Sequence, residues 1–195
     1  MDFLFDIGNV IIHVDFIPAL KRLIPPGTDD IDTRLHKLLE RKDEFEAGRI
    51  DSDVYFPWAT DILGFTGSQE EFIAAWLDIF EPNLPMWKVI EKLHSEGHRL
   101  ILFSNINNPH KEYLLGKHQI FQYFTGGIFS YQTGHIKPEF QIYQLAVKQY
   151  GLTATSTAYI DDLPKNIAAG QDAGFICHTY RADQHDQFLQ WLSSI

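Results

Sequence analysis

Short, continuous apolar runs alternate with helix-like segments through most of this chain. Runs of this kind are typical of strands that are buried on both faces of a sheet. The predicted strands are Phe3 to Ile7, Arg99 to Ser104, Gly127 to Ser130, Thr157 to Ile160 and Phe175 to His178. Strands that alternate with helices favour an α/β fold, in which a parallel sheet is covered by helices on both faces.

Helical periodicity marks the segments between and after these strands. Met86, Val89, Ile90 and Leu93 follow the i, i+3, i+4, i+7 spacing of one helical face, and Gly97 then provides a typical helix end. Similar patterns predict four helices around the sheet: Pro85 to Glu96, Pro138 to Tyr150, Pro164 to Ala173 and about Ala182 to Ser193.

An interval of about 70 residues separates the first predicted strand from the next elements of the sheet, which is too long for a loop. It shows no clear strand but four helical stretches: Phe16 to Leu23, Ile31 to Phe45, Ser52 to Leu63 and Ser68 to Phe80. We therefore expect a helical subdomain over residues 15–84, inserted into an α/β core formed by residues 1–14 and 85–195.

Polar side chains stand where the predicted strands end, which is where open α/β sheets bind ligands. They are Asp6, Ser104, Asn105, Lys137, Asp161 and Asp162. Taken singly, a polar residue at a strand end is more often a helix cap, a turn residue or a solvated charge than a catalytic residue. Because the carboxyl ends of parallel strands share one edge, we expect all of them to converge, and this convergence favours a catalytic site.

The chemistry of this set suits phosphoryl transfer. Asp6 can attack phosphorus and form an aspartyl-phosphate, which divides one difficult displacement into two easier ones. Together with Asp161 and Asp162, Asp6 offers the hard oxygen ligands that Mg²⁺ prefers. Lys137 supplies a compact cation for the phosphoryl oxygens, and Ser104 can donate a hydrogen bond to them. We expect Asn105, next to Ser104, to bind substrate as well.

The bulk properties limit the partners and the location of the protein. With 26 acidic and 16 basic residues the net charge is −10, which disfavours binding to nucleic acid or to anionic membranes. Cys177 is the only cysteine, so no intrachain disulfide can form, and its apolar surroundings favour a buried, inert thiol. Without a signal peptide or a stretch of the roughly 20 apolar residues that a membrane span needs, we expect a cytoplasmic protein.

Asp6, Ser104, Lys137 and the pair Asp161-Asp162, in this order, resemble the motifs of the haloacid dehalogenase superfamily. The resemblance covers essentially the whole chain. It implies a Rossmann-like core with an inserted α-helical cap, and a magnesium-dependent phosphatase that acts on a small phosphorylated metabolite. In this resemblance, Asp6, Asp162 and the carbonyl of Gly8 bind the metal, and Asp161 and Asn166 support them.

The segment from Phe5 to Ile11 resembles more closely the branch with bacterial glucose-1-phosphate phosphatases and the phosphatase domain of soluble epoxide hydrolases. Most superfamily phosphatases have a second Asp as general acid and base where this chain has Gly8. Loss of this group costs typically about 10²–10⁴-fold in rate. The sequence therefore favours a substrate whose leaving group is comparatively acidic, such as a hexose 1-phosphate. His13 and Asp15 could replace the missing acid, but each more often caps a turn.

Other residues are open to two interpretations. Aromatic residues of the insert could line a sugar-sized pocket, although helical spacing more often indicates core packing; they are Phe45, Tyr55, Phe56, Trp58 and Trp76. The stretch from Glu44 to Arg49 could face the active site. Asn107, Asn108 and His110 could hold substrate or start a helix.

Two rival functions are a dehalogenase-type hydrolase and a non-catalytic descendant that binds a ligand. The sequence leaves the oligomeric state open.

Overall fold

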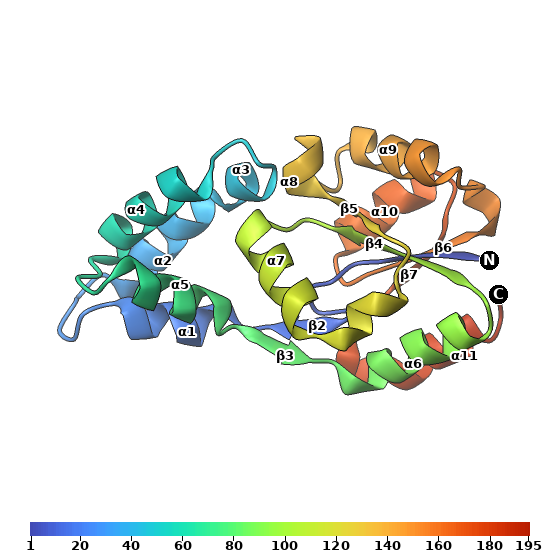
Figure 1. Ribbon diagram of the computed structural model, residues 1–195, viewed down its shortest axis with the longest axis horizontal. Helices are drawn as coiled ribbons and strands as arrows, with labels where there is room; N and C mark the ends of the chain where they lie inside the picture. The colour runs from blue at the N-terminus through green and yellow to red at the C-terminus, as the bar shows by residue number, and fades with distance from the viewer.

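The computed structural model describes residues 1–195 and has a five-stranded parallel sheet at its centre (Figure 1). The strand order is β5-β4-β1-β6-β7. The strands are β1 (Asp2–Phe5), β4 (Arg99–Ser104), β5 (Gly127–Phe129), β6 (Thr157–Asp161) and β7 (Ile176–Thr179). All five lie within two residues of the predicted runs, so the predicted α/β fold with a Rossmann-like parallel sheet is confirmed.

Alternate residues of the central strand β1 pack against helices on opposite faces of the sheet. Phe3 and Phe5 belong to the apolar cluster that includes residues of α6 (Leu84–Ser95), α7 (Asn108–Lys117) and α11 (His185–Leu192). Leu4 belongs to the cluster that includes residues of α9 (Phe140–Tyr150) and α10 (Pro164–Asp172). Figure 1 shows the two helical layers on either side of the sheet. The central strand is therefore buried on both faces, in agreement with its continuous apolar sequence.

Several short elements complete the core. They are α8 (Ser130–Thr133) and the 3₁₀ helices η1 (Gln119–Tyr123), η2 (Ala154–Ser156) and η3 (Ala182–Gln184). The C-terminal helix predicted as one element is divided into η3 and α11. Helix α7 was missed by the sequence analysis because its polar and apolar residues do not separate into two faces.

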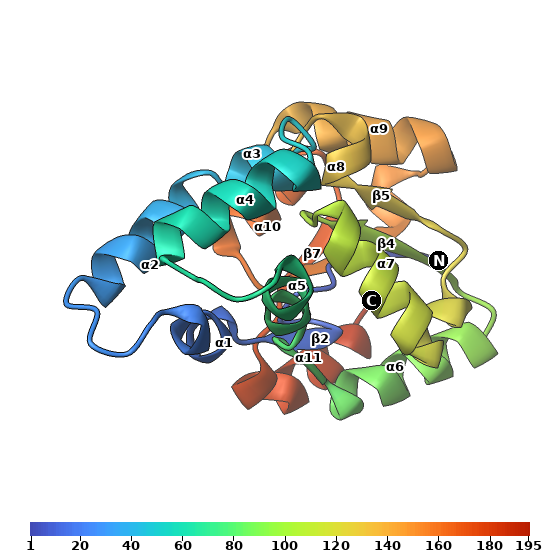
Figure 2. The ribbon, with the colours of Figure 1, turned by 60° about the vertical axis from the view of Figure 1, so that its left-hand side comes forward.

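Five helices lie beyond the carboxyl ends of the strands and form a separate layer (Figures 1 and 2). They are α1 (Phe16–Leu23), α2 (Ile31–Glu40), α3 (Lys42–Glu46), α4 (Ser52–Leu63) and α5 (Gln69–Leu77). The stretch Ile31 to Phe45, predicted as one helix, is broken at Arg41. These helices, which we call the cap, pack around an apolar cluster of their own.

A short antiparallel ribbon, which the sequence analysis missed, connects the cap to the core. Its strands are β2 (Ile12–Val14) and β3 (Phe80–Pro82), with Val14 opposite Phe80. Each strand has only three residues, which is too short for a period-two pattern to be recognised in the sequence. The ribbon holds the two connections between cap and core side by side.

The aromatic residues of the cap pack against one another. The rings of Phe45 and Tyr55 stack with centroids 4.1 Å apart, and Trp76 makes edge contacts with Tyr55 and Phe56. They belong to the buried cluster of the cap, with Trp58 at its margin, and they do not line the cavity described below. Core packing, the alternative to a sugar pocket, is thus what the structure shows. No helix of the chain combines the length and the apolar character that a membrane crossing requires.

Candidate active site

The structure brings three carboxylates together at the carboxyl edge of the sheet. Asp6 directly follows β1, and Asp161 and Asp162 stand at the end of β6, which pairs in parallel with β1. One oxygen from each of these carboxylates lies within 4.8 Å of the others. Such a set of hard oxygen donors, two buried and one partly exposed, suits a small divalent cation such as Mg²⁺.

Lys137 is the central cation of this group. Its Nζ lies 2.9 Å from Oδ1 of Asp6 and 2.6 Å from Oδ2 of Asp161, and it also donates to the carbonyl oxygen of Phe103 at 2.7 Å. The side chain is only 1% exposed. Burial alone would lower the pKa of Lys137, but attraction to Asp161 and Asp6 raises it above the ordinary value. The side chain is therefore held as an ammonium ion with all three protons engaged.

Asn105 fixes the backbone of Lys137. Its Oδ1 accepts a hydrogen bond from the Lys137 N–H at 2.7 Å, and its Nδ2 donates to the Lys137 carbonyl at 2.9 Å. The sequence analysis expected Asn105 to bind substrate. Asn105 does line the cavity, but both ends of its amide are occupied by Lys137, which gives it a positioning role.

Asp161 is fully buried, and both of its oxygens have donors from the protein. Oδ1 accepts from the backbone N–H of Leu163 at 2.9 Å and from Asn166 Nδ2 at 3.0 Å. Oδ2 accepts from the Tyr159 hydroxyl and from Lys137, each at 2.6 Å. Because its oxygens are already engaged, Asp161 is better suited to hold Lys137 and the loop after β6 than to act as a direct metal ligand.

Asp162 is more exposed and is oriented by a residue that the sequence analysis did not single out. Asn9 donates from Nδ2 to Oδ2 of Asp162 at 3.1 Å, and its Oδ1 accepts from the Val14 N–H at 3.2 Å. Asn9 has a φ of 52°, in the left-handed region that Asn tolerates better than most residues. An Asn directly after Gly8 was the available signal for this turn.

The carboxylates at this edge outnumber the one lysine. Burial raises the pKa of Asp6 to about 7; Lys137 opposes this shift, whereas Asp161 and Asp162 add to it. Burial also raises the pKa of Asp162, against the hydrogen bond from Asn9. A cation at this edge would offset the repulsion and favour the ionised form of Asp6.

A cavity of about 280 Å³ lies over this edge, between the core and the cap. Asp6, Ser104, Lys137 and Asp162 line its core side. The residues contributed by the cap and the ribbon divide into a polar set, Lys42, Asp43 and Glu46, and an apolar set, Val14, Phe16 and Phe80. A ligand on Asp6 would therefore meet both polar and apolar groups on the opposite wall.

The loop between α3 and α4 rests directly on the core, and of the stretch from Glu44 to Arg49, which could have faced the active site, only Glu46 lines the cavity. The Ser130 hydroxyl donates to the carbonyl oxygen of Glu46 and accepts from the Ile106 N–H at 2.9 Å. A Cβ built on Gly48 would overlap the carbonyl oxygen of Tyr131. We call these contacts the cap–core seam.

Arg49 extends the cap–core seam at the surface. It donates to the Gly134 carbonyl and to Glu139, both at 3.1 Å. His135, on the same core loop as Gly134, contacts the other oxygen of Glu139 at 2.9 Å.

His110 lines the cavity but is buried, and both of its ring nitrogens have partners. Its Nε2–H donates to the Trp76 carbonyl at 3.2 Å, and its Nδ1 accepts from Asn107 at 3.0 Å. Burial lowers the pKa of His110 to about 3, so the ring is neutral. Asn107 caps helix α7 by accepting from the His110 N–H, and Asn108 is the first helical residue. A helix start thus explains the roles of Asn107 and Asn108.

His13 and Asp15, considered above as replacements for the missing acid, do not line the catalytic cavity. They line a separate hollow at the ribbon, together with Arg22 and Asp78. Neither side chain is therefore placed to protonate a leaving group in that cavity.

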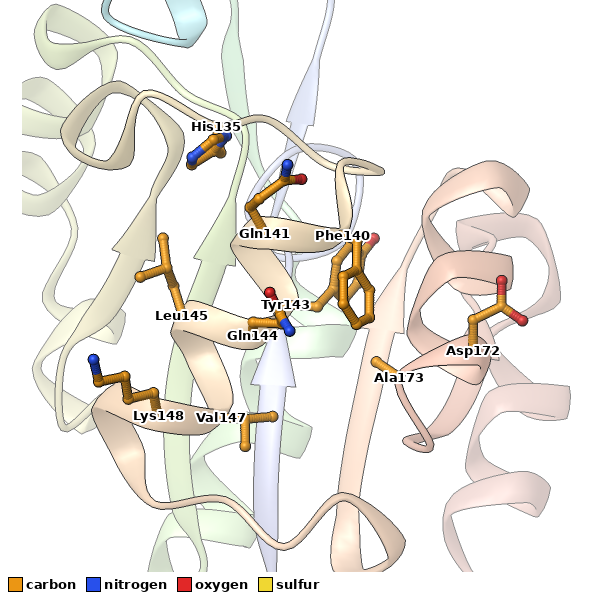
Figure 3. A pocket seen from close by; sticks show the side chains of 10 residues that line it. All are labelled: His135, Phe140, Gln141, Tyr143, Gln144, Leu145, Val147, Lys148, Asp172 and Ala173. Carbon is orange, nitrogen blue, oxygen red and sulfur yellow. The ribbon is translucent and has the colours of Figure 1, made fainter.

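A wider hollow of about 730 Å³ lies between α9 and α10 (Figure 3). Phe140, Tyr143 and Lys148 of α9 line it, with Asp172 on the opposite helix. It brings no cluster of carboxylates together and lies apart from Asp6. The smaller cavity at the edge of the sheet is therefore the candidate active site.

Comparison with known proteins agrees with this geometry. The family profile described as haloacid dehalogenase-like hydrolase matches residues 3–174. A D-ribitol-5-phosphate phosphatase of Bacteroides thetaiotaomicron is 30% identical over 98% of this chain and 96% of its own length. A sesquiterpene phosphatase of Aspergillus oryzae is 26% identical over 89% and 86%.

Solved structures share the fold. A haloacid dehalogenase-family enzyme of B. thetaiotaomicron superposes with a TM-score of 0.82 at 23% identity, covering 96% of this chain and 97% of that one. The wild-type form of that enzyme has also been solved with magnesium and inorganic phosphate, and this complex superposes with a TM-score of 0.79 at 23% identity, covering 94% and 95%. A predicted hydrolase of the same type from Porphyromonas gingivalis gives 0.77 at 23% identity, covering 98% and 97%.

Proposed function

The chain belongs to the haloacid dehalogenase-like hydrolase family, and from this membership we propose that it is a magnesium-dependent phosphatase of small phosphomonoesters. The observation that carries the proposal is the arrangement of Asp6, Lys137 and Asp162 at one edge of the sheet, beneath a cavity of about 280 Å³. Both curated relatives described above are named phosphatases, which supports this reaction over the alternatives.

Asp6 is the proposed nucleophile. Its carboxylate forms a bond to phosphorus while the bond from phosphorus to the leaving oxygen breaks. Water then attacks the aspartyl-phosphate, which releases inorganic phosphate and restores the carboxylate. Lys137, held 2.9 Å from Asp6, remains an ammonium throughout and offsets the charge of the phosphoryl oxygens.

The supporting residues keep these groups in place. Ser104, which is buried at the end of β4, is proposed to donate to a phosphoryl oxygen. Asn105 holds the Lys137 backbone and contributes through it.

For the metal we propose Asp6, the Gly8 carbonyl and Asp162 as protein ligands. Asp161 and Asn166 act as supporting residues, because Asp161 accepts from Lys137, Tyr159, Leu163 and Asn166. When bound, Mg²⁺ supplies positive charge that reduces the repulsion between the Asp6 carboxylate and a phosphate dianion.

The proposed substrate is a phosphorylated sugar or sugar alcohol. The Gly8 position favours an acidic leaving group, as in a hexose 1-phosphate, whereas the relative named for D-ribitol 5-phosphate favours the ester of an ordinary alcohol. Lys42 and Glu46 on the cap wall offer hydrogen-bonding groups to hydroxyls in either case. We further propose a cytoplasmic location, which a single cysteine and an acidic surface support.

A substrate panel tests the proposal. Glucose 1-phosphate, glucose 6-phosphate, ribitol 5-phosphate and 2-chloropropionate are incubated with the protein, with Mg²⁺ or with a chelator. Phosphate release that requires Mg²⁺ and disappears in Asp6→Asn is the expected result. Chloride release from the haloacid would favour a dehalogenase, and no product from any compound would favour a non-catalytic descendant. Equal or reversed rates on the two glucose phosphates would reject the preference for an anomeric phosphate.

A further inference from the structure

The catalytic cavity contains one buried carboxyl group that the proposed reaction has not yet used. Four acidic side chains line the cavity: Asp6, Asp43, Glu46 and Asp162. Asp6 is the proposed nucleophile, Asp162 is assigned to the metal, and Asp43 is exposed to solvent. Glu46, on the cap wall, is only 6% exposed.

Two contacts hold Glu46 over the phosphate-binding side of the core. Lys42, one helical turn earlier, approaches its Oε2 at 2.8 Å. Its carbonyl oxygen accepts from the Ser130 hydroxyl, which itself accepts from the N–H of Ile106. Ile106 lies two residues after Ser104, so one hydroxyl joins the backbone of Glu46 to the loop that would bind the phosphoryl group.

Lys42, Asp43 and Lys165 line the cavity without being buried, and the buried titratable groups nearby are already engaged. His110 uses both ring nitrogens for Trp76 and Asn107. The Tyr55 hydroxyl donates to the Leu38 carbonyl, and Lys137 makes three contacts within the core. Glu46 is the buried carboxyl that remains.

The groups that influence the charge of Glu46 come from three elements. Burial raises its pKa, Lys42 of the same helix opposes this shift, Asp43 adds to it, and Lys137 of the core opposes it. The neighbouring Tyr55 of α4 is a neutral phenol whose own pKa is raised by burial and by Glu46. A carboxyl group in such surroundings can alternate between the neutral and ionised forms during a reaction.

We propose that Glu46 of the cap is the general acid and base of the phosphatase reaction, taking the place of the carboxyl that is absent at Gly8. The inference rests on the proposed function. It adds the residue that exchanges protons with the leaving group and with water.

The proposed role of Glu46 conserves protons over the two halves of the reaction. As Asp6 bonds to phosphorus, the bond from phosphorus to the leaving oxygen breaks, and the electron pair of the broken bond stays on the leaving oxygen. The Glu46 carboxyl transfers its proton to this oxygen, so the alcohol departs neutral and Glu46 becomes a carboxylate beside Lys42. In the second half, water attacks phosphorus and gives its proton to Glu46, and the Asp6 carboxylate is released.

The test compares two leaving groups in Glu46→Gln. An ordinary sugar-alcohol phosphate such as ribitol 5-phosphate needs a proton on the departing oxygen, whereas p-nitrophenyl phosphate leaves as a stabilised phenolate. We expect phosphoryl transfer from ribitol 5-phosphate to Asp6, measured in a single turnover, to slow about 10²–10⁴-fold. For p-nitrophenyl phosphate the burst of p-nitrophenolate, which reports the same transfer step, should stay within a few-fold of wild type. Hydrolysis of the aspartyl-phosphate, for which Glu46 is the base, should slow equally with both substrates. Glu44→Gln, an exposed neighbour on α3 outside the cavity, should match wild type on both substrates.

Other outcomes contradict the inference in distinct ways. Equal losses in the phosphoryl-transfer step on both substrates, with an unchanged unfolding temperature, would mean that Glu46 only binds or positions substrate. No loss on ribitol 5-phosphate would also overturn the acid role. If wild type hydrolyses neither ester, or if Asp6→Asn still hydrolyses them, the proposed function itself fails.

Discussion

The catalytic edge of the sheet and the cap that faces it are constructed in opposite ways. At the edge, Lys137 and Asp161 are fully buried charged residues, and each is satisfied by several partners. The cap instead buries aromatic and aliphatic side chains, and it presents Lys42 and Glu46 to the cavity from the short helix α3. The edge holds the proposed nucleophile, whereas the cap provides the groups that face the part of the ligand that leaves.

Removal of the nucleophile is the strongest test of the edge. Asp6→Asn should lower kcat on every phosphomonoester by about 10⁴-fold or more, since no other carboxylate lies within bonding distance of Lys137 on the cavity side. Single-turnover assays with p-nitrophenyl phosphate measure this loss. Asp172→Asn, on the surface of α10, is the matched control and should retain full activity. Residual Mg²⁺-dependent turnover in Asp6→Asn would place the nucleophile elsewhere.

Lys137→Met should strongly destabilise the edge of the sheet. It leaves Asp161 and Asp6 buried without their shared cation, for which a loss of about 3–5 kcal/mol in the free energy of unfolding is expected. Urea denaturation at neutral pH measures the loss. A value under about 1 kcal/mol would show that the edge tolerates unpaired carboxylates.

The metal-free protein should lose stability as the pH rises from about 4 to about 7. Burial raises the pKa of Asp6 to about 7, so the folded state holds a proton that the unfolded chain has already released in this range. The Asp6 carboxyl group makes its full contribution to the free energy of unfolding below pH 3.8. This contribution is lost as the pH approaches 7, which lowers the free energy of unfolding by roughly 2–4 kcal/mol.

The difference between wild type and Asp6→Asn isolates that contribution, since Asp162 and Glu46, whose pKa values are also raised, remain in both proteins. Unfolding temperatures in the presence of chelator give the measurement. Mg²⁺ should reduce the pH dependence in wild type, and parallel pH profiles for the two proteins would contradict the prediction.

Gly48→Ala tests whether the cap must rest on the core. An Ala side chain there would overlap the Tyr131 carbonyl and would also need a positive φ, so we expect a loss of about 1–3 kcal/mol in stability and a lower kcat/KM. Gly134→Ala is a matched control, because Gly134 also has a positive φ but has open space around its Cβ position. If the two variants behave alike, the cap–core seam does not depend on close contact at Gly48.

The ion pair between Arg49 and Glu139 should matter least. Both side chains are partly exposed, so Arg49→Met should change the free energy of unfolding by less than about 1 kcal/mol. In steady-state assays at low salt, the KM of Arg49→Met should be slightly higher than that of wild type. At high salt the pair is screened in wild type, so the two KM values should agree.

The fold and much of the candidate site follow from local patterns in the sequence. The strands are recognisable because continuous apolar runs are needed for burial on both faces, and the strand ends then place Asp6, Ser104 and Asp161 at one edge. Helices α1 and α4 have the predicted boundaries, because their apolar periodicity coincides with clear starts and ends.

The features that sequence analysis missed depend on tertiary contacts. Glu46 lies in the stretch that the sequence analysis expected could face the active site, but nothing in the sequence distinguishes it from Glu44, and its burial is seen only in the folded structure. The amide of Asn105 could equally serve a substrate until the structure shows it bonded to Lys137. The three-residue strands of the ribbon are defined by their pairing rather than by their composition.

Asn9 has a consequence for how the two halves of the molecule respond to each other. One end of its amide contacts Asp162, and the other contacts Val14 in the ribbon that carries the chain into and out of the cap. A single short side chain thus connects Asp162, a proposed cation ligand, to the ribbon. If a tilt of the ribbon that strains this amide weakens cation affinity, then by thermodynamic reciprocity an occupied cation site resists the same tilt to the same extent.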